Sequence, residues 1–264
     1  MAMGERLYRT SGVIIKRFDV GEADRVLTIL TPFGKISANA RGIRKTASRL
    51  AGHLELLSFC QLQLAIGKSR DVVTQSVAIE RFEAIQQRLY TMAASYYLTE
   101  LTDNFVTDSD IASPALTHLL ASLHMLCQPS QIEMVMHWYT LQLSDVAGYR
   151  PQLFDCAVCG SRLDEQTDRW SIAQGGMLCP DCVRADPKAI TISLALFKLL
   201  RFVQREPLAT VAQTVQPFAL HTSAFQLLQQ WVVQHSEQPL RSAVFFDDVR
   251  HKEYQDTVEI EHGQ

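Results

Sequence analysis

Apolar and polar residues alternate in short runs near the N-terminus, a pattern that predicts β-strands. The segment Cys60–Leu64 alternates cleanly, so one face of that strand is expected to be buried and the other solvated. Turn residues around Gly21 and Gly34 separate the first runs and are typical of hairpins. Five strands are predicted: Tyr8–Phe18, Arg25–Thr31, Lys35–Ala40, Leu56–Ile66 and Val72–Ala78.

Five short antiparallel strands within about seventy residues are typical of a small barrel such as the OB-fold. An SH3-like barrel fits the same pattern almost as well, so the spacing of the strands leaves both open.

The pattern changes to a helical one after residue 80. Seven of the twelve glycines lie in residues 1–67, and none occurs from there until Gly148. A long stretch without glycine favours helices. Ser113 and Pro114 are predicted to cap and begin one helix, and Ser193 to cap another. The predicted helices are Glu80–Val106, one from Ser113 to before Pro129, Gln131–Ala147, Ser193–Val203, and Pro217–His235 with Trp231 on its inner face.

The composition of the 264 residues, 47% hydrophobic and 20% charged, is that of a globular protein with ample core material. No apolar run approaches the roughly 20 residues that span a bilayer. The N-terminus lacks the apolar core of a signal peptide. We therefore expect a reducing cytoplasm, in which Cys60 and Cys127 need no partner and serve as core residues.

The net charge of -3 conceals an uneven distribution. Residues 1–80 contain twelve Lys and Arg against seven Asp and Glu, whereas the remaining residues contain thirteen against twenty-one. A basic N-terminal part on an acidic body favours contact between the former and a polyanion.

The loop after the third predicted strand concentrates that positive charge. Between residues 35 and 49 there are five basic residues and no acidic one. Such a run is often only a solvated loop. Beside a barrel groove we favour contacts to nucleic-acid phosphates instead. The candidate DNA-binding residues are Lys35, Arg41, Arg44, Lys45 and Arg49.

Two Cys-x-x-Cys pairs, Cys156 with Cys159 and Cys179 with Cys182, are separated by nineteen residues. This spacing is typical of a structural zinc site, in which four thiolates close a tetrahedron and leave no position for water. Two disulfides, four unrelated thiols or a thioredoxin-like redox pair are the alternatives. We favour one structural zinc ion, because nothing marks the chain as secreted and a redox role needs only one pair.

The predicted organisation is α+β. An N-terminal five-stranded OB-fold barrel over residues 1–79, basic and DNA-binding, precedes a helical domain over residues 80–255. The four-cysteine zinc module is inserted into that domain at about residues 153–185, and residues 256–264 form a polar tail that is expected to fray.

Signatures of catalysis are absent from the sequence. Gly67–Ser69 resembles the end of a P-loop, but Leu62 stands where that motif needs its first glycine, so a hairpin turn is the better interpretation. The histidines have no metal-protease spacing, and no acidic cluster suggests bound magnesium. A zinc-ribbon enzyme such as a nuclease, or a protein-interaction scaffold, remains the alternative to a DNA-binding protein without catalysis.

The order of these features resembles the RecO family of bacterial recombination mediators and DNA repair proteins. The resemblance covers nearly the whole chain and depends on the shared order of motifs, each of which is short. The matching stretches are residues 21–25, 31–35 and 40–48 in the barrel, 97–101 in the first helix, 148–151 leading into 156–160, and 240–242 near the end.

This resemblance implies a function beyond what the residues themselves predict. Proteins of this family bind single- and double-stranded DNA, anneal complementary strands, and work with RecR to load RecA onto strands coated by single-strand-binding protein. None of these steps needs nucleotide hydrolysis, so the chain is not expected to be an enzyme. The resemblance also implies a groove in the helical body for the C-terminal tail of single-strand-binding protein, and a bacterial, cytoplasmic, nucleoid-associated location.

Overall fold

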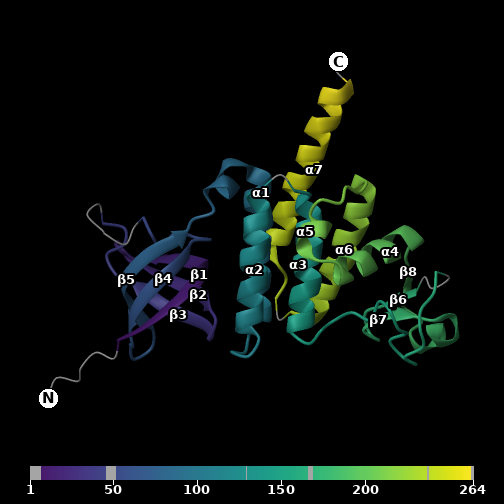
Figure 1. The fold of residues 1–264 in the computed structure, drawn as a ribbon, viewed down its shortest axis with the longest axis horizontal. Coiled ribbons are helices and arrows are strands. Elements are labelled where there is room, and N and C mark those ends of the chain that lie inside the picture. Colours follow the sequence, from purple (N-terminus) through teal and green to yellow (C-terminus); the bar gives the residue numbers. More distant parts are fainter. Residues whose placement is uncertain (1–6, 46–51, 129, 166–168, 237, 263–264) are drawn as a thin grey trace.

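A computed structural model describes residues 7–45, 52–128, 130–165, 169–236 and 238–262, with side chains up to residue 256. A barrel of strands lies at one end, a bundle of helices occupies the middle, and a small three-stranded sheet lies at the other end (Figure 1). The predicted class, an OB-like barrel followed by a helical domain, is confirmed.

The barrel closes in the order β1-β2-β3-β5-β4. All neighbouring strands are antiparallel except β3 and β5, which pair in parallel at Ala38 and Asp71. β1 pairs with β4 through its first half and with β2 through its second, so one long strand belongs to both sides of the barrel. The strands are β1 (Leu7–Val20), β2 (Asp24–Thr31), β3 (Gly34–Ala40), β4 (Phe59–Ala65) and β5 (Asp71–Glu80).

The close approach of β1 to β2 requires glycine at position 12. A Cβ atom at this position would lie 2.5 Å from the carbonyl oxygen of Leu30, which is too close for any side chain. Inside the barrel, alternate residues such as Leu27, Ile29 and Leu62 are buried, as the period of two requires. Cys60 is also fully buried there, which confirms its prediction as a core residue.

The helical body is built around α1, which packs against α2, α3 and α7. Trp231 is 1% exposed on the inner face of α6, as its position in the predicted helix indicates. The helices are α1 (Leu89–Phe105), α2 (Ala112–Leu126), α3 (Ile132–Val146), α4 (Leu194–Arg205), α5 (Leu208–Val211), α6 (Phe218–His235) and α7 (Arg241–His262), and a short 3-10 helix, η1 (Glu83–Gln87), precedes α1.

Two predicted helix starts differ from the structure. β5 continues to Glu80, and Phe82 then turns the chain with a φ of 49°, so α1 begins at Leu89 rather than at residue 80. Ser113 lies inside the first turn of α2, whose N-cap residue Ile111 makes no capping hydrogen bond. By contrast, the hydroxyl of Ser193 accepts a hydrogen bond from the Leu196 amide at 3.2 Å, which confirms the predicted cap of α4.

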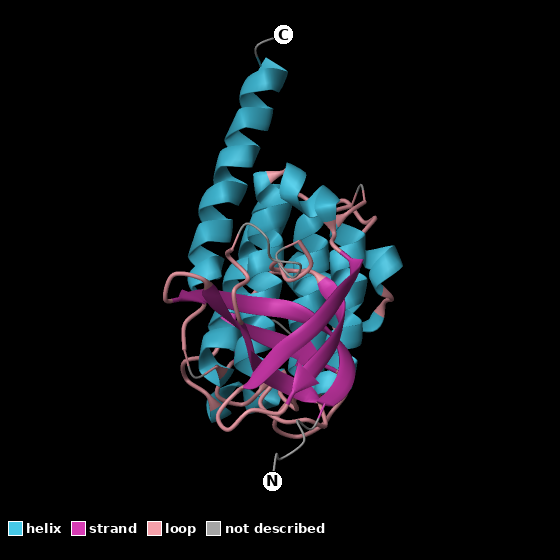
Figure 2. Ribbon diagram, turned by 90° about the vertical axis from the view of Figure 1, so that its left-hand side faces the viewer, coloured by secondary structure: helices cyan, strands magenta, loops and turns pink. Residues whose placement is uncertain are grey.

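The polar tail predicted from residue 256 continues instead as helix, because α7 runs to His262. Its last turns extend beyond the rest of the molecule (Figures 1 and 2). Polar residues at helical spacing without an apolar face are compatible with a helix that protrudes into solvent.

The outer face of the barrel shares a hydrophobic cluster with the helices. The outward-facing residues Val13, Ile15 and Leu30 belong to the same buried cluster as the helices. β1 contacts α1, and β2 and β3 contact α2, so the helices cover one face of the barrel (Figure 2). The two domains are therefore joined by burial of apolar surface, not only by the chain between them.

The small sheet is held against the helical body. It consists of β6 (Arg169–Ser171), β7 (Gly176–Leu178) and β8 (Ile190–Thr191), in the order β7-β6-β8, with the 3-10 helix η2 (Pro180–Ala185) between the last two strands in sequence. Trp170 of β6 packs edge-on against Trp231 of α6, with 5.4 Å between the ring centroids. This contact fixes the sheet to the bundle.

Candidate metal centre and nucleic-acid interface

The structure brings the four cysteines of the two Cys-x-x-Cys pairs together. Their sulfur atoms all lie within 4.8 Å of one another, and the Sγ atoms of Cys159 and Cys179 are 3.7 Å apart. Zinc–sulfur bonds of about 2.3 Å in a tetrahedron place neighbouring sulfurs about 3.8 Å apart. All four thiols are free of disulfides. The separation of the sulfurs fits a tetrahedral metal ion.

Each pair lies on a tight turn, as metal-binding knuckles do. The Gly160 amide donates to the Cys156 carbonyl at 2.9 Å. Gly160 has a φ of 72°, a backbone conformation that residues with a side chain rarely adopt. The Cys182 amide donates to the Cys179 carbonyl at 3.0 Å. Across the site, the Cys179 amide points at the Cys156 sulfur at 3.4 Å. Backbone donors aimed at a sulfur stabilise a thiolate.

The surroundings of the four cysteines stabilise the thiolate form to different extents. Hydrogen bonds from the Ser161 hydroxyl and amide lower the pKa of Cys159 to about 6. Hydrogen bonding to the neighbouring sulfurs of Cys179 and Cys159 raises the pKa of Cys182 to about 12. A divalent cation would remove this difference, because its charge stabilises all four thiolates at once.

Burial indicates a structural role for this site. Cys156 and Cys179 are 3% and 9% exposed, and both belong to the main hydrophobic cluster. Four sulfur ligands leave no open coordination position for a substrate. A metal ion held here would tie the chain around residue 156 to the chain around residue 182.

The basic loop after β3 is anchored to the tip of the β1–β2 hairpin. Its Ile43 side chain is 2% exposed and packs into the hydrophobic cluster of the barrel. The Gly42 amide donates to the Asp24 carboxylate at 2.7 Å, and the Arg44 amide donates to the Ala23 carbonyl at 3.0 Å. These contacts hold the start of the loop in one place while its cations point outward.

Three of the five predicted DNA-binding cations lie on this anchored loop. Arg41, Arg44 and Lys45 are exposed. The Arg44 guanidinium is 3.6 Å from the Asp19 carboxylate, and both side chains are at least 40% exposed, so solvent screens this pair strongly. Arg49 lies outside the described residues.

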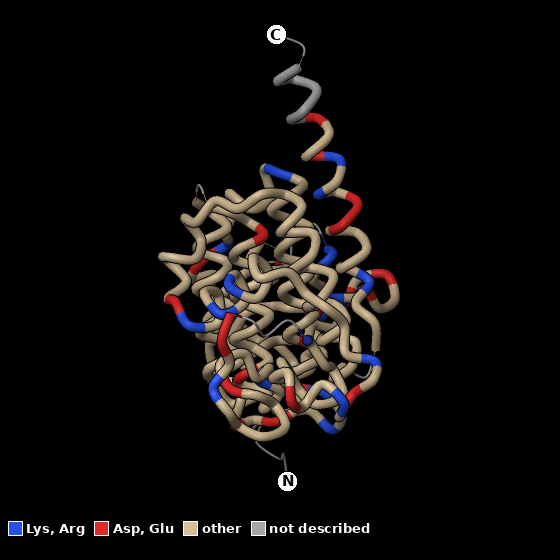
Figure 3. The backbone as a smooth tube through the Cα atoms, turned by 90° about the vertical axis from the view of Figure 1, so that its right-hand side faces the viewer, with Lys and Arg blue, Asp and Glu red and all other residues tan. Residues whose placement is uncertain are grey.

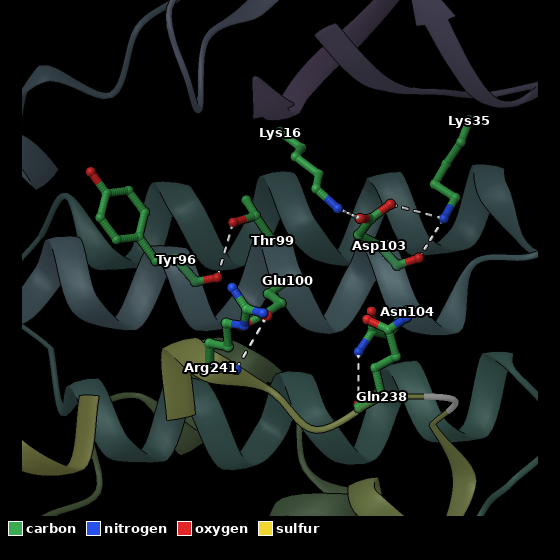
Figure 4. Close-up of polar contacts among 9 residues, drawn as sticks. All are labelled: Lys16, Lys35, Tyr96, Thr99, Glu100, Asp103, Asn104, Gln238 and Arg241. Carbon is green, nitrogen blue, oxygen red and sulfur yellow. Dashed lines mark hydrogen bonds and ion pairs between the residues drawn. The ribbon is translucent and has the colours of Figure 1, made fainter. Parts of the chain in front are cut away.

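Lys35 has a different environment from the loop cations. Its side chain is 24% exposed, and its ammonium contacts the Asp103 carboxylate of α1 at 3.0 Å as well as the Asp103 carbonyl. Lys16 reaches the same carboxylate at 2.9 Å (Figure 4). The structure therefore separates Lys35 from the other candidates and places it at the seam between barrel and helices.

Burial alone would raise the pKa of Asp103, but the hydrogen bonds from Lys16 and Lys35 outweigh it and lower that pKa. Sequence reasoning missed this trio, because Asp103 lies far from both lysines along the chain and no local motif connects them. The same seam holds a groove of about 460 Å³ lined by both domains. On the helical side of the groove Glu100 accepts from the amides that begin α7 (Figure 4).

Charges on the side of the molecule away from the barrel are mixed. Positive and negative residues alternate over the helical body and along α7 without a large area of one sign (Figure 3). The cluster of exposed cations beside the barrel thus differs from the opposite side of the protein. In the described part of the chain, no helix is long and apolar enough to cross a membrane.

An OB-like barrel with exposed cations at one end is joined here to a helical body with a four-cysteine cluster, and OB-folds in other proteins bind oligonucleotides and oligosaccharides. Comparisons with known proteins give the family. Residues 3–82 match the family described as Recombination protein O N terminal, and residues 86–243 match Recombination protein O C terminal. The chain belongs to the RecO family.

Individual relatives agree with this assignment. The chain is 44% identical to a protein named DNA repair protein RecO from Roseiflexus sp. (strain RS-1), over 94% of this chain and 88% of that protein. It is 37% identical to a DNA repair protein RecO from Dehalococcoides mccartyi, over 77% of this chain and 81% of that protein. A third, from Desulforamulus reducens, is 28% identical over 92% of this chain and 94% of that protein.

Proposed function

We propose that this protein is a recombination mediator without catalytic activity. It binds single- and double-stranded DNA, anneals complementary strands and, together with RecR, helps to load RecA onto strands coated by single-strand-binding protein. The observation that carries this proposal is the group of exposed cations on the anchored loop, Arg41, Arg44 and Lys45, at the end of an OB-like barrel. Membership of the RecO family supports it.

The physical basis of annealing is charge neutralisation. Two DNA strands repel each other through their phosphates, and cations that displace condensed counterions lower that repulsion. A loop whose backbone is fixed while its side chains are exposed contacts phosphates without reading bases, so annealing proceeds on any sequence. No nucleotide binding or hydrolysis enters this scheme.

A strand-annealing assay with labelled complementary oligonucleotides tests the proposal. We expect the protein to accelerate annealing equally with and without ATP and Mg²⁺, and to leave the strands intact. Failure to accelerate annealing at low salt would overturn the annealing role. Magnesium-dependent shortening of the strands would establish the alternative, a nuclease.

For the metal centre we propose one structural zinc ion per chain, held by Cys156, Cys159, Cys179 and Cys182. The separations of the four sulfurs and the absence of disulfides among them support this. The all-sulfur ligand set favours zinc over harder ions such as magnesium or calcium. When bound, the ion supplies cross-linking and folding energy.

The helical body is the proposed docking site for the C-terminal tail of single-strand-binding protein. The proposed location of the protein is the bacterial cytoplasm, at the nucleoid. Family membership supports both. A tail peptide carrying a photo-crosslinker, added to the full chain at low salt, tests the docking site. We expect cross-links within residues 86–243; cross-links confined to the barrel, or none at all, would contradict it.

A further inference from the structure

The end of β1 exposes an aromatic and an apolar side chain to solvent. Phe18 and Val20 are 46% and 44% exposed. Because successive residues of a strand point to opposite faces, the two share one face of the β1–β2 ribbon. Arg17 and Asp19 point to the other face, where Arg17 pairs with Glu55 and Asp19 with Arg25. The exposed face therefore carries no acidic residue of β1.

The strand register shows what lies beside these two side chains. Phe18 is opposite Val26, and Val26 is opposite Asn39 on β3. Residues directly opposite each other share a face of the sheet. Phe18 thus stands at the edge of a row that continues through the buried Val26 to the amide of Asn39.

The next row toward the barrel end joins this face to the basic loop. Val20 is opposite Asp24, whose carboxylate accepts the hydrogen bond from the Gly42 amide. Arg41 follows directly on the last residue of β3, Ala40, which pairs with Arg25 next to Asp24. Arg41 therefore begins the loop at the same end of the sheet as Phe18 and Val20, across β2 and Asp24 from them, and its side chain is exposed.

In the other direction along β1 the face is polar and again cationic. Lys16 is opposite Thr28, and Thr28 is opposite Ser37. Residues two apart along a strand are separated by about 7 Å. Phe18 is thus two residues from Lys16, whose side chain is 60% exposed and whose ammonium pairs with Asp103, and it lies toward the end of the sheet at which Arg41 begins the basic loop.

We propose that Phe18 is a stacking platform for one base of single-stranded DNA, with Val20 beside it and the phosphates of the same strand at Arg41. An exposed aromatic ring on a barrel whose basic loop begins at the same end fits unpaired nucleic acid, because every base has a π face and every nucleotide a negative charge. Bases of a duplex are already stacked, so Phe18 contributes to binding single strands only. This inference rests on the DNA-binding function proposed above and adds a strand preference to it.

Replacing the ring tests the stacking contact. Phe18→Ala is expected to weaken binding of a labelled oligothymidine by about 5- to 100-fold, the range for loss of one base–aromatic stack. Phe18→Tyr should bind like the parent, whereas Phe18→Leu, which keeps apolar area without a π face, should resemble Phe18→Ala. Affinity for a blunt duplex should be unchanged in all three variants. Equal losses for single strand and duplex, or parental affinity of Phe18→Ala or Phe18→Leu, would overturn the proposal.

A second phenylalanine of the barrel provides the matched control. Phe33 is 79% exposed in the turn between β2 and β3, at the opposite end of these strands from Phe18. Phe33→Ala should leave binding of both DNAs unchanged. Thermal melting of each variant verifies folding, since Phe18 lies beside the buried Val26. A loss of affinity in Phe33→Ala as large as that in Phe18→Ala would contradict the assignment to Phe18.

The salt dependence separates this contact from the loop cations. Stacking releases no counterions, so Phe18→Ala should lower affinity at every salt concentration while the slope of log K against log salt stays parental. A Phe18→Trp variant gives a direct signal. Oligothymidine stacked on the new, exposed indole should quench its fluorescence, whereas the parent, whose three tryptophans are all buried, should show no such quenching. If the parent protein binds no DNA, the proposed function is refuted. If the parent binds DNA but substitutions of Phe18 leave its affinity unchanged, only this inference is refuted.

Discussion

The ammonium of Lys35 lies 3.0 Å from the Asp103 carboxylate, and this contact connects strand β3 of the barrel to helix α1. Lys16 of β1 approaches the same carboxylate. One aspartate therefore joins two barrel strands to the helical body at a position where the Asp103 side chain is only 18% exposed. A lysine that the sequence suggests as a DNA contact is held at the domain seam instead of projecting from the loop.

Asp103→Asn is expected to destabilise the protein. The substitution removes the negative charge and leaves two lysines close together, which costs about 1–2 kcal/mol in the free energy of unfolding. The effect should fade as pH falls into the acid range. The pKa of Asp103 is lowered in the folded state, so its stabilisation is fully present above the unfolded pKa and is lost as pH falls through the folded pKa. Urea unfolding at neutral and acidic pH measures both.

Asp110→Asn is the control for this experiment, since Asp110 is exposed in the loop before α2, where its carboxylate lies 3.4 Å from the Ser109 hydroxyl. It should leave the unfolding midpoint unchanged. Unchanged stability of Asp103→Asn would show that apolar packing alone holds the seam.

Replacing Arg41, Arg44, Lys45 and Arg49 with alanine should weaken DNA binding for every sequence alike. Each phosphate contact to a single strand contributes a slope of roughly -0.7 in log K against log salt, so the slope should become shallower. Because exposed loop side chains contribute little to folding, stability should change by no more than about 0.5 kcal/mol per site. Fluorescence anisotropy titrations at several salt concentrations provide the measurement.

A matched variant removes four exposed cations far from the basic loop in sequence: Arg162 and Lys188 of the cysteine and small-sheet segment, and Lys198 and Arg205 of α4. Its charge change equals that of the loop variant, but we expect parental affinity and slope. If both variants lose affinity equally, overall charge rather than the loop governs binding, and the proposed interface is wrong.

Removing the metal should destabilise the module around the cysteines. Protein purified without a histidine tag is expected to contain one zinc per chain by elemental analysis. At free zinc 100- to 1,000-fold above Kd, binding stabilises the folded state by roughly 3–4 kcal/mol, so a chelator should lower the melting temperature. Cys179→Ser should lose the zinc, while Cys127→Ser, outside the cluster, should keep it. Zinc-free protein with six freely titrating thiols in the folded state would refute the site.

A buried histidine pair predicts a pH dependence of stability. His137 of α3 and His221 of α6 are 2% and 3% exposed, with Nδ1 of His221 3.4 Å from Nε2 of His137. Burial, the neighbouring His221 and the buried Arg250 of α7 hold the pKa of His137 well below its usual value. Burial also lowers the pKa of His221, against the attraction of Glu133.

The sign of this dependence follows from the depressed pKa. Above about pH 6.5 the histidines are neutral in both states; below it the unfolded chain takes up protons that the folded chain does not. Stability should fall by up to about 1.4 kcal/mol per pH unit for each histidine between pH 6.5 and 5.5. His137→Met should flatten this slope in urea unfolding, whereas His251→Gln, on the exposed side of α7, should not. A parental slope in His137→Met would contradict the assignment.

Patterns of neighbouring residues predicted most of the secondary structure. The alternation from Cys60 to Leu64 is strand β4 with one buried face, and Ser193 caps α4. The interval between the two cysteine pairs predicted four converging sulfurs, and the structure has them. The strand and the helix cap depend on backbone geometry over a few residues, which the order of residue types records. The cysteine site depends on the spacing within and between the two pairs, which can also be counted along the chain.

Contacts between distant segments were decided by the tertiary structure alone. Nothing near Asp103 in the sequence indicates that Lys16 and Lys35 will reach it, and nothing near Phe18 indicates that the basic loop will begin at the same end of the sheet. Barrel closure sets the register between strands, and packing of α1 and α2 on the barrel decides which of its cations are paired. The sequence by itself determined most of the strands and helices and the four cysteines that converge. Which side chains share a face or a partner depends on how those elements pack, because charge pairing and exposure are properties of the assembled surface.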